Sequence, residues 1–110
     1  MTQKHRTLSL AERAALEREY MARSGIRTLI NSISGGVDSA SVAAISKQAA
    51  PEATLGLILP CSTEEELKGE RLQDVLDARR VAEHLGIPAV TVNLSDLWQQ
   101  AVALYTEKAR

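Results

Sequence analysis

The sequence predicts an α/β protein built on a parallel sheet, with about three strands and four helices. Short apolar stretches alternate with longer stretches of amphipathic helical pattern. Glycine or proline stands at several junctions between them. The order is one helix followed by three strand–helix units, which is typical of right-handed crossovers in a parallel sheet. With 110 residues the chain is expected to form one domain, with helices on both faces of the sheet.

The leading helix is predicted over residues 10–23. Ser9 precedes it and Glu12 follows three residues later, which is the spacing of a capping box. Gly25 is expected to end the helix, because glycine adopts the left-handed conformation of a helix C-cap without strain.

Three strand–helix units are predicted after this helix. The expected strands are residues 28–33, 54–59 and 89–94, and the expected helices are residues 38–49, about 70–85, and a last one capped by Ser95 or Asp96. The stretch 54–59 is almost continuously apolar, so we expect it to be covered on both faces. The three helices are expected to bury Val42, Ile45, Ala49, Leu72, Val75, Leu76, Ala82, Leu85, Leu97, Ala101, Leu104 and Tyr105. A polar loop over residues 62–69 contains three glutamates.

The composition excludes several classes of protein. Thirteen Lys and Arg against fourteen Asp and Glu give a net charge of −1, which argues against a broad electrostatic grip on nucleic acid or membrane. No apolar run approaches the ~20 residues of a membrane span. Cys61 is the single cysteine, which excludes an internal disulfide and fits a reducing cytoplasm. We expect this thiol to be buried or half-buried at a strand end.

Residues 34–39 read Ser-Gly-Gly-Val-Asp-Ser between the first expected strand and a helix. Two glycines permit a turn with positive φ, expected at Gly35 or Gly36, and let a ligand approach the backbone. The helix N-terminus directs N–H groups and a positive dipole at this point, which predicts a cradle for a phosphate group. The alternative is an ordinary turn in which Asp38 only caps the helix.

The loop differs from three other well-known loops. The Walker motif needs a Gly-Lys pair, and no lysine follows Gly36. The dinucleotide fingerprint needs a third glycine where Ser39 stands. A nucleophile elbow needs glycine on both sides of the corresponding serine, which neither Ser34 nor Ser39 has.

The loop matches Ser-Gly-Gly-x-Asp-Ser, the pyrophosphate-binding motif of the ATP pyrophosphatases, at each fixed position. Within that superfamily the chain resembles the ammonia-dependent NAD synthetases. A long helix precedes the first strand, the second strand ends in Leu59-Pro60-Cys61-Ser62, and the next helix carries Asp77-Ala78. The resemblance implies a three-layer, adenine nucleotide α-hydrolase-like fold. Residues 1–110 are then the N-terminal part of one ATP-pyrophosphatase domain, with a leading helix in 1–27 and the nucleotide-binding βαβαβα unit in 28–110.

The resemblance also implies a reaction and a site. Enzymes of this family adenylate deamido-NAD with ATP, and ammonia then displaces AMP. Asp38 is the implied ligand of Mg²⁺, and no catalytic side chain is implied. The residues implied to bind ATP are Ser32, Ile33, Ser34, Gly35, Gly36, Val37, Asp38, Ser39, Leu59 and Pro60. A cytoplasmic homodimer that acts on ATP, deamido-NAD and ammonia, with no nucleic acid or membrane partner, is expected.

Two alternatives stay open at this point. A tRNA-thiolating enzyme also carries Ser-Gly-Gly-Val-Asp-Ser and a helix with Asp-Ala-Arg, as residues 77–79 do. The other alternative is an inactive nucleotide-binding or interaction module. In the resembled family, later segments supply a second acidic metal ligand and much of the deamido-NAD site. We therefore expect the 110 residues to form no NAD by themselves and to self-associate.

Overall fold

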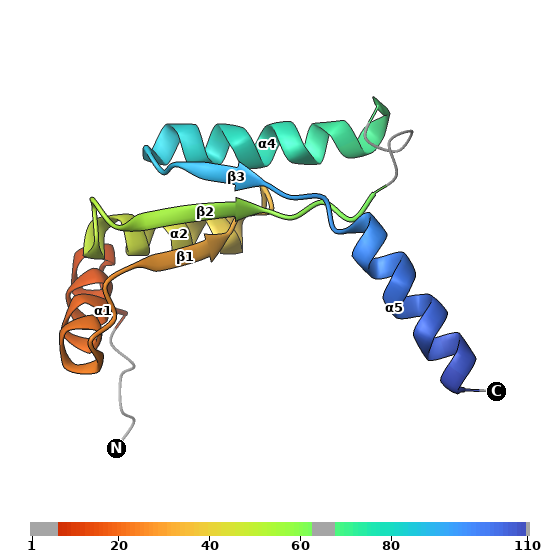
Figure 1. The fold of residues 1–110 in the computed structure, drawn as a ribbon. Helices are drawn as coiled ribbons and strands as arrows, with labels where there is room; N and C mark the ends of the chain where they lie inside the picture. Colours follow the sequence, from red (N-terminus) through yellow and green to blue (C-terminus); the bar gives the residue numbers. More distant parts are fainter. Residues whose placement is uncertain (1–6, 63–67, 110) are drawn as a thin grey trace, which may run out of the picture.

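The structure is a computed structural model that describes residues 7–62 and 68–109. A leading helix and three strand–helix units follow one another along the chain, as Figure 1 shows. The elements are α1 (Leu10–Ser24), β1 (Leu29–Ser32), α2 (Val37–Ala49), β2 (Thr54–Ile58), α4 (Glu70–Leu85), β3 (Ala89–Thr91) and α5 (Ser95–Lys108). The predicted order and type of these elements are confirmed. The predicted polar loop spans residues 62–69, and its part 63–67, which holds the three glutamates, lies outside the described residues.

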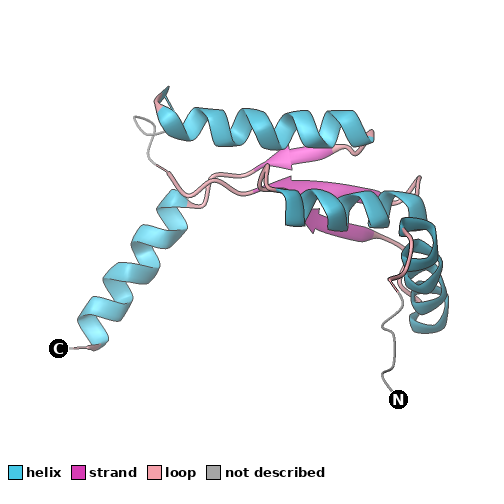
Figure 2. Cartoon of the chain, turned by 180° about the vertical axis from the view of Figure 1, so that it is seen from behind, coloured by secondary structure: helices cyan, strands magenta, loops and turns pink. Residues whose placement is uncertain are grey.

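The three strands form a parallel sheet in the order β1-β2-β3. Successive right-handed crossovers that step in one direction across a sheet place their helices on one face. Accordingly, α2 and α4 lie side by side over the same face, in front of the strands in Figure 2, and α1 packs against α2. The side chains between these helices and the sheet form the core, which includes Ala43 and Ala49 of α2 and a cluster of Ile33, Ile58, Val75, Ala78 and Ala82.

The opposite face of the sheet is uncovered by the described residues. Leu55 on β2 is 43% exposed and Val90 on β3 is 60% exposed, and Ile30 on β1 lies on the same face. The prediction that residues 54–59 are covered on both faces is therefore wrong for the described chain. The strand order explains this difference, because the order β1-β2-β3 places both crossovers on one face. The apolar pattern of an individual strand does not reveal the order of the strands in the sheet.

Helix ends follow local sequence rules more closely than helix faces do. Ser9 and Glu12 form the predicted capping box, with the Glu12 N–H donating to Ser9 Oγ at 3.1 Å. Gly25 and Gly86 end α1 and α4 in the left-handed conformation. The predicted cap at Ser95 or Asp96 is wrong, since Leu94 holds the N-cap position and Asn93 Oδ1 accepts from the Ser95 N–H.

Several predictions of buried side chains are wrong, on three of the helices. Val42 is 55% exposed and Ile45 is half-buried, because α2 turns its small residues Ala43, Ser46 and Ala49 inward. Leu72 is exposed in the first turn of α4. No residue of α5 is buried, so Leu97, Ala101, Leu104 and Tyr105 are exposed, and Figure 1 shows this helix projecting away from the sheet.

The third strand is shorter than predicted, although its pairing continues. The Val92 N–H donates to the carbonyl of Ile58 and the Leu94 N–H donates to that of Pro60. Both strands therefore run on past their regular ends toward the same edge of the sheet. Among the described residues, no helix has the length and apolar character that crossing a membrane requires.

Candidate functional site: the loop between β1 and α2

Residues 34–36 connect the carboxyl end of β1 to the N-terminus of α2. Ile33 fixes the start of this loop: its N–H donates to the carbonyl of Leu57 at 2.8 Å, and its side chain is 1% exposed in the core. Gly36 holds the N-cap position of α2, and no side-chain hydrogen bond caps the helix there. The N-terminal N–H groups of α2 therefore remain directed at this edge of the sheet, the arrangement that binds anions at helix N-termini.

The two glycines of the loop have different conformations. Gly35 has φ +86°, which confirms the prediction of a positive φ at one of the pair. A Cβ at Gly35 would lie 3.1 Å from Asp77 Cβ and 3.3 Å from the Ala78 nitrogen, so the loop rests against the backbone of α4. Gly36 has φ −85° and ψ 164°, and a Cβ there would meet only Ser34 Oγ, at 3.4 Å.

The serine hydroxyls hold the loop closed on itself. The Ser34 N–H donates to Ser39 Oγ at 3.1 Å, and the two hydroxyl oxygens lie 3.0 Å apart. Ser34 Oγ also accepts from the Gly36 N–H, and Ser39 Oγ donates to the Gly36 carbonyl. Asp38 is exposed in the first turn of α2, and Gly36, not Asp38, holds the N-cap position of that helix. The interpretation of Asp38 as an N-cap is thus wrong.

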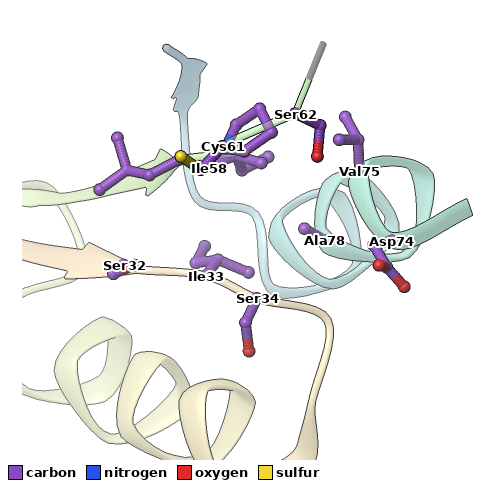
Figure 3. A pocket seen from close by; sticks show the side chains of 11 residues that line it. Ser32, Ile33, Ser34, Ile58, Cys61, Ser62, Asp74, Val75 and Ala78 are labelled. Carbon is purple, nitrogen blue, oxygen red and sulfur yellow. The ribbon is translucent and has the colours of Figure 1, made fainter. Parts of the chain in front are cut away.

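A pocket of about 250 Å³ opens beside the loop, between the ends of β1 and β2 and the start of α4 (Figure 3). Five of the predicted ATP-binding residues line it: Ser32, Ile33, Ser34, Leu59 and Pro60. The others, Gly35, Gly36, Val37, Asp38 and Ser39, form the loop and the first turn of α2 next to it. The sequence therefore brings both predicted groups of residues to one edge of the sheet.

Other residues of this pocket were not predicted as site residues. They are Ile58, Cys61, Ser62, Asp74, Val75 and Ala78. The Asp77-Ala78 pair was the sequence signal that could have indicated that α4 lines the pocket. The lining residues of this helix are Ala78 itself and two residues in the turn before it, Asp74 and Val75. Cys61 is exposed, so the prediction of a buried or half-buried thiol is wrong. Its backbone has left the sheet at this point, and its side chain lines the pocket.

The donor set suits a magnesium ion only in part. Among the described residues, no group of three or more His, Cys, Asp or Glu side chains gathers that could hold a metal ion. Mg²⁺ is usually bound through one or two carboxylates together with substrate phosphates and water. Asp38, exposed in the first turn of α2, offers one carboxylate of that kind.

Comparison with known proteins agrees with this geometry. The chain matches the family model described as NAD synthase over residues 10–110. It is 40% identical over 86 residues to an NH(3)-dependent NAD(+) synthetase of Carboxydothermus hydrogenoformans, a match that covers 78% of this chain and 32% of the relative. The chain belongs to the NAD synthase family. It spans about a third of the length of that relative.

Solved structures of NAD synthases share the fold. The NAD+ synthetase of Burkholderia pseudomallei superposes with a TM-score of 0.74 at 21% identity, over 94% of this chain and 46% of that one. These structures support the α/β parallel-sheet class predicted from the sequence. The chain is also 36% identical over 78 residues to a tRNA-specific 2-thiouridylase of Chlamydia trachomatis, over 69% of this chain and 22% of that protein.

Proposed function

We propose that residues 34–39 bind the pyrophosphate moiety of ATP and that the chain forms the ATP-binding part of an ammonia-dependent NAD synthetase. In the proposed reaction ATP adenylates the nicotinate carboxylate of deamido-NAD, pyrophosphate leaves, and ammonia displaces AMP. The observation that carries the proposal is the loop: Gly35 at φ +86° turns the chain so that an uncapped helix N-terminus follows directly. Membership of the NAD synthase family supports the same reaction.

The chain's own contribution to this reaction is electrostatic. Pyrophosphate carries several negative charges as it leaves, and fixed N–H dipoles at a helix N-terminus stabilise developing charge without reorganising. Ser34 and Ser39 exchange hydrogen bonds with each other in this structure and have hydroxyls that can turn toward a phosphate oxygen. The pocket beside the loop, with Leu59 and Pro60 in its wall, is the proposed place of the adenine ring.

Asp38 is the proposed protein ligand of Mg²⁺. Its carboxylate stands in the first turn of α2, adjacent to the residues proposed to hold the phosphates. When bound, the ion neutralises phosphate charge and orients the leaving pyrophosphate. The protein donates one carboxylate among the described residues, so binding of nucleotide and of metal should depend on each other.

Replacement of Asp38 by alanine is expected to weaken Mg²⁺-dependent ATP binding at least tenfold. Tenfold corresponds to about 1.4 kcal/mol, and one charge-assisted contact contributes about 1.5–3 kcal/mol. Calorimetric titration with and without Mg²⁺ measures the effect. Asp96 occupies the same position in the first turn of α5, so Asp96→Ala is the matched control and should leave affinity unchanged. Equal ATP affinity in Asp38→Ala and wild type rules out this role for Asp38.

The proposed assembly is a homodimer in the cytoplasm. The uncovered sheet face, with Ile30, Leu55 and Val90, and the apolar side chains of α5 expose surface that association would bury. We expect sedimentation equilibrium to give a mass above the 11.9 kDa of one chain. Val90→Lys should shift the distribution toward the monomer, while Leu16→Lys, at an exposed position of α1, serves as the control. A wild-type chain that sediments as a clean monomer contradicts this assembly.

A tRNA-thiolating enzyme is the second candidate, favoured by the similarity to the 2-thiouridylase of Chlamydia trachomatis. ATP binding is common to both candidates, so the acceptor substrate must distinguish them. The test is a titration of the chain, with Mg²⁺ and ATP present, against deamido-NAD in one arm and against tRNA in the other. Because later segments of the resembled family supply much of the deamido-NAD site, weak but saturable binding of deamido-NAD supports the synthetase, whereas binding of tRNA alone supports the alternative. Residues 1–110 by themselves are expected to bind ATP without forming NAD.

A further inference from the structure

A buried polar cluster connects β1, which precedes the proposed pyrophosphate-binding loop, to α2, which follows it. Asn31 lies on β1, Ser46 lies on the inner side of α2, and Glu17 lies on α1. Ser46 Oγ is 3.1 Å from Asn31 Oδ1 and 3.2 Å from Glu17 Oε1. Ser46 is 1% exposed and Asn31 is 8% exposed. Buried polar groups of this kind are costly unless every hydrogen bond is made.

The number of hydrogen atoms in this cluster determines which group can donate and which must accept in each hydrogen bond. A serine hydroxyl has one hydrogen, so Ser46 cannot donate to both oxygens. The Nδ2 amide of Asn31 is buried and lacks a partner among the described residues. Half a turn of the carboxamide about its last torsion exchanges Oδ1 and Nδ2 at almost constant shape. With nitrogen facing Ser46, Asn31 becomes the donor, and the Ser46 hydrogen is free to go to Glu17.

We propose that Asn31 donates to Ser46, that Ser46 donates to Glu17, and that this directed chain of hydrogen bonds makes Asn31 a positioning residue for the pyrophosphate-binding loop. The positioning role rests on the proposed function of that loop. Glu17 is a suitable end of the chain, because an ionised carboxylate only accepts hydrogen bonds and strengthens those it receives.

The placement of the cluster explains how it acts on the loop. Asn31 and Ser46 lie on opposite sides of residues 34–39 along the chain, so their contact fixes α2 against β1 at a defined angle. That angle sets the separation between the end of β1 and the N–H groups at the start of α2. Arg18 of α1 reinforces the arrangement by donating to the carbonyls of Ala49 and Gln48 at the end of α2. Apolar contacts alone are non-directional and would permit sliding.

Asn31→Asp tests the direction of the chain, because a carboxylate has the shape of the amide but no donor. One Ser46 hydrogen would then serve two carboxylates. Burial and the neighbouring Glu17 should raise the pKa of the introduced carboxyl above its ordinary value of about 3.9. Among the other charged groups of α1 and α2, Arg18 donates to carbonyls at the end of α2 and Lys47 Nζ donates to the Pro51 carbonyl. Glu12 accepts from the Ser9 N–H, Glu19 pairs with Arg23, and Arg13 and Asp38 are exposed.

A raised pKa in the folded state gives a definite sign to the pH dependence. The protonated carboxyl can donate, so the variant should approach wild-type stability near pH 4 and lose stability as the pH rises through the folded pKa. At pH 7 we expect its Tm to be at least about 5 °C below that of wild type. Gln48→Glu is the matched control, since it makes the same change of amide to carboxylate at an exposed position of α2.

Binding of inorganic pyrophosphate with Mg²⁺ at pH 7 tests the positioning role. Asn31→Leu conserves approximate size, adds no charge and leaves Ser46 free to donate to Glu17, so it should fold while losing the tie to β1. We expect at least a tenfold weaker affinity for Asn31→Leu and no change for Gln48→Glu. Measuring both affinities on chains shown to be folded separates positioning from stability.

Each outcome decides one part of the inference. An Asn31→Asp variant as stable as wild type at pH 7 overturns the direction, because Asn31 would then accept from Ser46. An Asn31→Leu variant that binds pyrophosphate like wild type overturns the positioning role. If wild type itself binds no pyrophosphate, the proposed function fails and the positioning role fails with it. The pH-dependent stability of Asn31→Asp still decides whether Asn31 donates to Ser46.

Discussion

Gly36→Val is expected to weaken ATP and pyrophosphate binding by at least about 100-fold. A 100-fold loss is roughly 2.7 kcal/mol. In the proposed complex the phosphates lie against the backbone N–H groups at the start of α2, where a branched side chain would keep them at a distance. Loss of two charge-assisted hydrogen bonds, each contributing about 1.5–3 kcal/mol, accounts for an effect of this size. Isothermal titration with Mg²⁺ present measures it.

The fold itself should tolerate this valine, which makes the experiment a test of the ligand site. Gly36 has φ −85° and ψ 164°, an extended conformation that β-branched residues adopt readily. A Cβ at this position would meet Ser34 Oγ at 3.4 Å, an ordinary contact, and otherwise open space. We expect an unchanged circular dichroism spectrum and a Tm close to that of wild type. Normal ATP binding by this variant would place the phosphate cradle elsewhere in the molecule.

The sequence was sufficient to predict those features that depend on local rules. The capping box at Ser9 and the helix end at Gly25 both follow from residues a few positions apart. The turn at Gly35 and the helix start after it were predictable for the same reason. The glycines and serines of this loop and the helix that follows lie within one short segment, so their proximity needs no knowledge of the tertiary structure.

Side-chain burial was less predictable, because it depends on which faces the helices cover. Val42 and Ser46 are both on α2, and hydropathy favours burial of the valine. The structure buries the serine, which contacts Asn31 and Glu17 from two other elements. A polar residue becomes a good core residue only when its partners arrive from distant segments. The hydropathy pattern of α2 alone does not show that such partners exist.

The pocket illustrates the same limit at the site. Leu59 and Pro60 were expected near the ligand, whereas Asp74 and Ser62 were not. Asp74 reaches the pocket because α4 crosses back over the sheet and brings its first turns beside the end of β1. Gly35 lies directly against α4, since atoms of that helix fill the space that a Cβ would need. The sequence predicts a glycine here for the positive φ of the turn. The packing against α4, which also excludes a side chain at this position, is not visible in the sequence.

Gly35→Ala is therefore expected to destabilise the fold by about 2–5 kcal/mol. Two costs combine at this residue. An L-residue held at φ +86° in the left-handed region costs about 1–2 kcal/mol. A Cβ 3.1 Å from Asp77 Cβ and 3.3 Å from the Ala78 nitrogen must also displace the backbone of α4 or the loop, and overpacking of that kind costs about 1–3 kcal/mol.

Gly25→Ala separates these two costs, because Gly25 has a similar φ of +72° and nothing within 4 Å of the added Cβ. This control should lose only the conformational part, about 1–2 kcal/mol. Urea unfolding monitored by circular dichroism gives both values, and their difference is the free energy of the contact between the loop and α4. Equal destabilisation by the two substitutions would mean that the loop moves away from α4 at little cost. In that case α4 does not fix the position of the loop, and Gly35 is required only for its turn.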